Sequence, residues 1–161
     1  MADAPQDRIE RMTTDQIISN ITSKDVSRIR IAACEIISFS QDKEKVLQLK
    51  DFRQLIIDKT AGLKMEGAFA PNRRFVDYAL NIIDFHASDK RCPCNLYSGF
   101  KYECNDPNKE AELGNILIND ITKIENNWID YYSCSCKKCG QNFKIFERDG
   151  HYTFWEWEKL A

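Results

Sequence analysis

The stretch Cys134-Ser-Cys-Lys-Lys-Cys-Gly140 constrains the fold of this 161-residue chain more than any other. Cys136 and Cys139 are separated by two residues and followed by a glycine, a spacing that lets a tight turn aim two thiolates at one cation. Upstream, Cys92-Pro-Cys94 offers a second thiolate pair, although one residue separates these cysteines and the proline lacks an N–H. We therefore predict a structural Zn²⁺ held by Cys92, Cys94, Cys136 and Cys139.

Other residues leave alternatives open for this ligand set. The chain has seven cysteines, six of them after residue 91, and such clustering in a reducing compartment favours metal ligation over disulfides. Cys104 or Cys134 could replace one of the four ligands. His86 could also serve, but its place at the end of an apolar helical stripe is more typical of a core histidine. Zinc held by four thiolates is coordinatively closed, so it would stabilise the fold rather than activate water.

Residues 1–88 have the periodicity of helices. After a polar lead-in of 12 residues, Thr13 is expected to cap a first helix, and residues 23–37 carry apolar side chains at steps of three and four. Further helices are expected at 42–49, 51–60 and 72–87, with Gly62 ending the fourth. Antiparallel helices of this kind predict stacked hairpins, either HEAT-like or forming an irregular bundle.

Residues 89–161 instead predict an antiparallel sheet of about five strands, one of them after Cys92-Pro-Cys94 and others at 116–124 and 128–134. Residues 105–110 are expected to form a loop. The last two strands are expected to form a hairpin with a two-residue turn at Asp149-Gly150. That turn would set Ile145 opposite Phe154, with Phe143 and Tyr152 on the same face and Phe146, Trp155 and Trp157 on the other. One aromatic face is expected to cover the helices.

The chain as a whole is therefore expected to be α+β, with a helical subdomain (1–88) packed on a zinc-ribbon-like β subdomain (89–161). No apolar run approaches the length of about 20 residues that a membrane span needs, and no signal peptide is recognisable, so we expect a cytoplasmic protein without a membrane partner. None of the common catalytic motifs of hydrolases, nucleotide-binding enzymes or metalloproteases is present, and only two histidines are available. We therefore predict a protein that is not an enzyme.

Five phrases spread over most of the chain suggest a kind of protein. They are TTDQII (13–18), GAFAPNRRFVD (67–77), CPCNLY (92–97), CKKCG (136–140) and DGHYTFWEW (149–157). Their combination resembles the small bacterial immunity proteins that accompany polymorphic, contact-dependent or type VI-delivered toxins. The resemblance implies an antitoxin that is monomeric before complex formation, binds the C-terminal domain of a cognate toxin and covers its active site. Contacts are expected from residues 62–74, including Arg73 and Arg74, and from the carboxylates Glu147, Asp149, Glu156 and Glu158.

A zinc-ribbon regulator that binds nucleic acid is the alternative. It would use Lys137, Lys138 and Lys144 beside Phe143, Phe146 and Trp155, because such a mixture can hold phosphates and stack on bases. The net charge of −2 argues against this reading, since phosphate-driven affinity usually requires an excess of positive charge.

Overall fold

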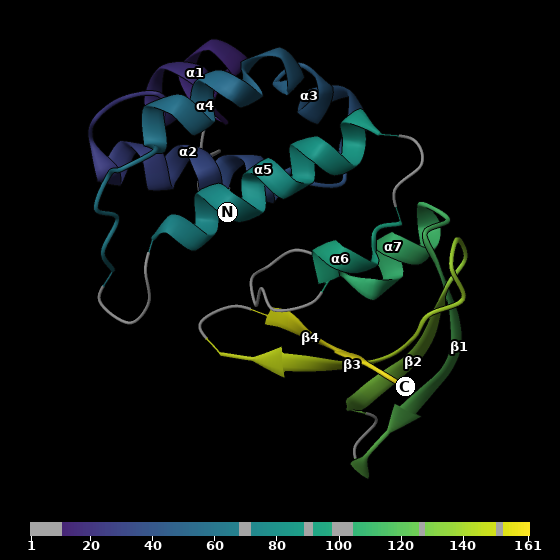
Figure 1. Ribbon diagram of the computed structural model, residues 1–161. Coiled ribbons are helices and arrows are strands. Elements are labelled where there is room, and N and C mark those ends of the chain that lie inside the picture. Colours follow the sequence, from purple (N-terminus) through teal and green to yellow (C-terminus); the bar gives the residue numbers. More distant parts are fainter. Residues whose placement is uncertain (1–10, 68–71, 89–91, 98–104, 126–127, 151–152) are drawn as a thin grey trace, which may run out of the picture.

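The computed structural model describes residues 11–67, 72–88, 92–97, 105–125, 128–150 and 153–161. It is α+β, with a helical half (described residues up to 88) and a sheet half (described residues from 92). Figure 1 shows α1 to α5 at one end of the molecule and the sheet at the other, with α6 and α7 between them. No helix in these described segments is long and apolar enough to cross a membrane.

The helical half follows the predicted periodicity closely. Its elements are α1 (Thr14–Ile21), α2 (Val26–Ser38), α3 (Lys43–Leu47), the 3₁₀ helix η1 (Lys50–Phe52), α4 (Arg53–Thr60) and α5 (Arg73–Ala87). Thr13 and Gln16 form a reciprocal capping box at the start of α1, and Asp25 caps α2 by accepting two backbone N–H groups. Gly62, with φ of 73°, follows the end of α4 as expected.

Helix α2 is the centre of this half and packs against both α1 and α5. Its stripe of Ile29, Ala33, Ile36 and Ile37 is fully buried, as the three- and four-residue steps predict. The helices range from five residues in α3 to fifteen in α5, and such unequal lengths fit an irregular bundle better than a stack of equal repeats.

The sheet half contains two short helices and a four-stranded antiparallel sheet of order β1-β2-β3-β4. The elements are α6 (Cys94–Tyr97), α7 (Pro107–Glu112), β1 (Ile116–Lys123), β2 (Ile129–Cys136), β3 (Asn142–Asp149) and β4 (Thr153–Lys159). The expectation of a loop at 105–110 is wrong, because residues 107–112 form a helix capped by Asp106. Residues 94–97 are helical where the strand after Cys92-Pro-Cys94 was expected to begin. The rest of that expected strand, up to Cys104, lies outside the described residues, and the described part of the chain has four strands.

The β3–β4 register also differs from the prediction. Asp149 pairs with Thr153, so three residues and not two separate the last paired positions, and Ile145 lies opposite Trp157. Relative to the predicted pairing, the partner of Ile145 is displaced by three residues along β4, from Phe154 to Trp157. Because side chains alternate between faces, displacement by an odd number of residues moves Trp155 and Trp157 to the face of Ile145. Tyr152, which was expected on that face, lies outside the described residues.

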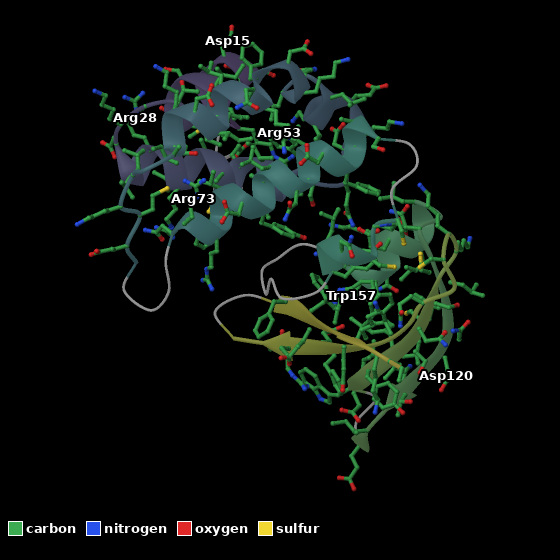
Figure 2. All side chains as sticks on the ribbon, viewed as in Figure 1. Asp15, Arg28, Arg53, Arg73, Asp120 and Trp157 are labelled. Atoms are coloured by element: carbon green, nitrogen blue, oxygen red, sulfur yellow. The ribbon has the colours of Figure 1, made fainter. Side chains whose placement is uncertain are left out.

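Helices α6 and α7, rather than α1 to α5, cover the buried face of the sheet. Tyr97 of α6 stacks on Trp157 with ring centroids 3.9 Å apart, and Phe143 meets both rings edge-on. Figure 2 shows Trp157 between β4 and α6. The indole N–H of Trp157 donates to the carbonyl oxygen of Asn105 at 3.0 Å. The predicted packing of the N-terminal helices directly on the sheet is thus replaced by contact through an intermediate layer.

Candidate metal centre

The four predicted cysteines come together at one point, although they belong to two distant parts of the chain. Cys92 precedes α6 and Cys94 begins it, whereas Cys136 ends β2 and Cys139 lies in the turn to β3. All four sulfur atoms lie within 4.8 Å of one another. The Sγ of Cys92 is 3.1 Å from that of Cys94 and 3.3 Å from those of Cys136 and Cys139. These four side chains could hold a metal ion.

The sulfur geometry and donor type fit a soft or borderline cation. The four cysteines are free thiols, since their separations are far above the S–S bond length of about 2.05 Å. A tetrahedral ion with Zn–S bonds of about 2.3 Å would set its sulfurs about 3.8 Å apart. The observed pairs need to open by less than about 1 Å to reach that arrangement. An all-thiolate set does not suit Mg²⁺ or Ca²⁺, which prefer oxygen ligands.

The turn between Cys136 and Cys139 has the backbone of a thiolate knuckle. Gly140 donates its N–H to the Cys136 carbonyl at 2.9 Å and has φ of 73°, a conformation that glycine adopts without strain. The N–H of Lys138 points at the Cys136 sulfur at 3.4 Å. The N–H of Gln141 does the same for Cys139. Such donors stabilise the negative charge of a thiolate ligand.

The Cys92-Pro-Cys94 pair uses the same device in spite of its proline. The N–H that serves the Cys92 sulfur is that of Cys94, which Pro93 does not remove. Pro93 instead accepts the N–H of Leu96 at 2.8 Å, which closes the first turn of α6. The missing proline N–H is therefore not one that this pair requires.

The protonation of the thiols reflects their different exposure. Burial raises the pKa of Cys92 and Cys94 above the ordinary value of a thiol. At Cys139, the N–H of Gln141 and the neighbouring Cys92 sulfur lower the pKa to about 7. A cation must therefore displace protons from the half-buried Cys92 and Cys94, whereas Cys139 loses its proton more readily.

The alternative ligands lie elsewhere or are engaged. Cys134 is buried in the core outside the cluster, and burial raises the pKa of its thiol to about 12. The Nε2 of the half-buried His86 lies 2.6 Å from the carbonyl oxygen of Ser40, and His86 is not part of the cysteine cluster. Cys104 lies outside the described residues.

The six residues predicted to bind a partner do not form one surface. Arg73 and Arg74 begin α5 in the helical half, where Arg73 bonds Asp77 and the Thr60 carbonyl oxygen. The four carboxylates belong to β3 and β4. Within this set, Glu147 accepts from Tyr132, Asp149 accepts from Thr153, Glu156 pairs with Arg148 at 3.4 Å, and Glu158 lies exposed opposite Lys144. Figure 2 shows Arg73 far from Trp157.

Exposed apolar side chains that the sequence analysis did not single out follow β1. They are Leu117, Ile121, Ile124 and Trp128, and Trp128 is the most exposed at 62%. In Figure 1, β1 is an outer strand, and its outer edge pairs with no described residue. The signal was present in the sequence, because Ile116, Leu117 and Ile118 are apolar in succession where a half-buried strand would alternate.

Comparisons with protein-family models, with curated proteins and with solved structures found no match to this chain.

Proposed function

We propose that this protein is a non-catalytic binding protein that neutralises a bacterial toxin domain by covering its active site. The observation that carries the binding role is the exposure of four large apolar side chains, on both faces of β1 and on its connection to β2. Exposed apolar groups beside an unpaired strand edge are typical of protein-binding surfaces. The toxin as partner follows from the resemblance to immunity proteins, in which occlusion requires no chemistry.

The second part of this proposal is a structural Zn²⁺ held by Cys92, Cys94, Cys136 and Cys139. Zinc accepts four thiolates in tetrahedral geometry, and a full set of protein ligands leaves no open position for water or substrate. When bound, the ion would stabilise the fold without taking part in a reaction. This closed donor set supports a protein that is not an enzyme.

A protein partner suits the open face of the sheet better than nucleic acid does. The face carries Tyr131 and Phe146, and the ammonium of Lys144 lies 3.9 Å from the Tyr131 ring centroid. Arg148 lies over Phe146 and also pairs with Glu156, so the rings and cations of this face already engage one another. Stacking on bases would require these rings to be uncovered.

The constellation expected for the alternative is also dispersed. Phe143 is buried, Trp155 lies on the opposite face from Phe146, and the Lys138 ammonium lies over Phe85 of α5. With a net charge of −2, the surface instead suits a basic protein partner, whose approach it would accelerate electrostatically. We expect the protein to act in the cytoplasm as a monomer until the toxin domain binds.

The test is co-expression with the C-terminal domain encoded immediately upstream in the native host. We expect restored growth, a stoichiometric complex, and one zinc per chain by elemental analysis. Trp128→Ala is expected to weaken the complex about 30-fold, as truncation of an interface tryptophan commonly does. Ile31→Ala is the matched control, because Ile31 is an exposed apolar residue of α2, and it should leave affinity unchanged. Recovery of nucleic acid that is released by salt, with no protein partner, would replace this proposal with the zinc-ribbon regulator.

A further inference from the structure

The junction between the helical half and the sheet half is only partly filled by apolar side chains. A cavity of about 220 Å³ lies there, lined by Ser40 and His86 from the helical half and by Leu96 and Asn115 from the sheet half. Because close packing is interrupted at this point, hydrogen bonds across the junction gain importance in fixing how the halves meet.

The carboxylate of Glu110 is the centre of these hydrogen bonds. Glu110 lies on α7 in the cavity wall and is only 4% exposed. Its carboxylate accepts from the Tyr97 hydroxyl at 2.6 Å, from Asn115 Nδ2 at 2.7 Å and from Gln41 Nε2 at 2.9 Å. Gln41 belongs to the helical half, 69 residues away in sequence. A buried carboxylate is costly unless it is hydrogen-bonded, so its position depends on these donors.

Each pair of cysteines is connected to Glu110 through a few residues, one pair through helix α6 and the other through hydrogen bonds. In the first path, Cys94 and Tyr97 are the first and last residues of α6, so fixing the sulfur also fixes the hydroxyl. In the second path, the N–H of Lys137, the residue after Cys136, donates to the Asn115 carbonyl at 3.0 Å. Asn115 in turn binds Glu110 twice, through its side chain and through its own N–H at 3.0 Å.

The knuckle also contacts the helical half directly. The ammonium of Lys138, which lies between Cys136 and Cys139, is 5.9 Å from the ring centroid of Phe85 on α5. The turn that would hold the metal is therefore attached to both sides of the junction.

We propose that Glu110 couples the metal centre to the helical half. Metal binding to the four cysteines orders α6 and the knuckle, and these hold Glu110 where it accepts the Gln41 amide. The coupling is reciprocal, so weakening the bonds of Glu110 weakens metal binding by the same factor as metal loss weakens the junction. The inference rests on the structural zinc of the proposed function and is independent of the toxin.

The first experiment measures zinc affinity by competition with a chromophoric chelator. Glu110→Leu keeps the approximate size of the side chain but removes all three acceptor contacts, and it is expected to weaken zinc binding about 10-fold. Glu110→Gln is the matched control. Its amide oxygen can accept from Tyr97 and Asn115, and its NH₂ can donate to Gln41 once that amide turns over, so the affinity should stay within about 3-fold.

A second variant protects the test against misfolding of Glu110→Leu. Gln41→Leu leaves the metal centre and α7 intact and removes only the donor from the helical half, and about 5-fold weaker zinc binding is expected. In the wild-type protein, zinc removal should also speed amide exchange around Gln41 and along α3.

The outcomes separate the two proposals. If the wild type binds one zinc but Gln41→Leu and a folded Glu110→Leu bind it as tightly, the coupling is overturned and the structural zinc stands. Unchanged amide exchange around Gln41 after zinc removal also overturns the coupling. If the wild type binds no zinc, both the structural zinc of the proposed function and the coupling are overturned.

Discussion

Between α1 and α5 the buried core is mostly aliphatic, whereas on the sheet it consists largely of aromatic rings and cysteines. In the helical half, isoleucines from α1, α2, α4 and α5 are enclosed on all sides. The sheet half has a single sheet covered on one face by helices of four and six residues. A half with so thin a cover encloses little apolar volume, and small cores of this kind commonly depend on a cross-link. The comparison teaches that the cysteine cluster lies in the half whose small core has more need of a stabilising cross-link.

The largest expected effect is on the difference in stability between the sheet half and the helical half. Removing zinc with a chelator, or substituting Cys136→Ser or Cys139→Ser, should unfold the sheet half, since structural zinc in small domains contributes about 10 kcal/mol or more. The helical half should keep its helical circular dichroism. Near-ultraviolet circular dichroism and amide exchange would follow the two halves separately.

Cys34→Ala is the control for that experiment, because Cys34 lies on α2 outside the cluster. It should leave both metal content and the near-ultraviolet signal intact. A Cys136→Ser protein with full thermal stability and undiminished metal content would contradict the four-cysteine assignment.

A core truncation in the helical half should show the opposite pattern. Ile36→Ala removes a fully buried side chain of α2 and is expected to cost about 2–5 kcal/mol in the free energy of unfolding. Zinc stoichiometry should not change. Ile31→Ala, on the same helix but 49% exposed, should cost less than about 0.5 kcal/mol. Urea unfolding of both variants measures the difference, and equal costs would mean that α2 does not bury the stripe described above.

Within the sheet half, Trp157→Phe should sharpen the comparison. The substitution keeps an aromatic ring on Tyr97 but leaves the Asn105 carbonyl without the indole N–H, at an expected cost of about 1–3 kcal/mol. Trp128→Phe is the matched control on the exposed strand connection and should be nearly neutral. Thermal unfolding of zinc-loaded protein compares them, and a neutral Trp157→Phe would show that this bond adds nothing to stability.

The smallest effect is expected from a helix cap. Asp25→Ala removes the acceptor of the Ser27 and Arg28 N–H groups and should cost about 1 kcal/mol. Because the cap belongs to the helical half, the cost measured by urea unfolding should be the same with and without zinc. Asp25→Asn keeps an acceptor and should recover most of the stability. A cost that vanished on zinc removal would mean that the stability of the helical half also depends on zinc.

The sequence predicted the helical half well because its signals are local. The stripe of Ile29, Ala33 and Ile36 and the cap Thr13 each act within one or two turns of helix. The cysteine cluster was also predictable, since the knuckle spacing and its glycine are local features and thiolates have few other reasons to gather in such a chain.

The sheet half was harder to predict because its structure depends on distant contacts. The β3–β4 register brings Trp157 onto Tyr97, a contact between residues 60 apart that no local turn signal contains. Helix α6 has only four residues, too few for a periodic pattern. Helix α7 did carry a usable signal, because Asp106 followed by Pro107 is a favourable helix start.

The spacing of the four clustered cysteines has a consequence for biosynthesis. Cys92 and Cys136 are 44 residues apart in sequence, with β1 and β2 between them. At a translation rate of about 5–20 residues per second, the first thiol pair is synthesised seconds before the second. The helices α1 to α5, which pack mainly on one another, can fold in that interval, whereas under the proposed function the sheet half must wait for the knuckle and for a metal ion. In a zinc-starved cell the newly made protein would therefore be a folded helical body with an unfinished C-terminal segment, which is the form that proteases degrade first.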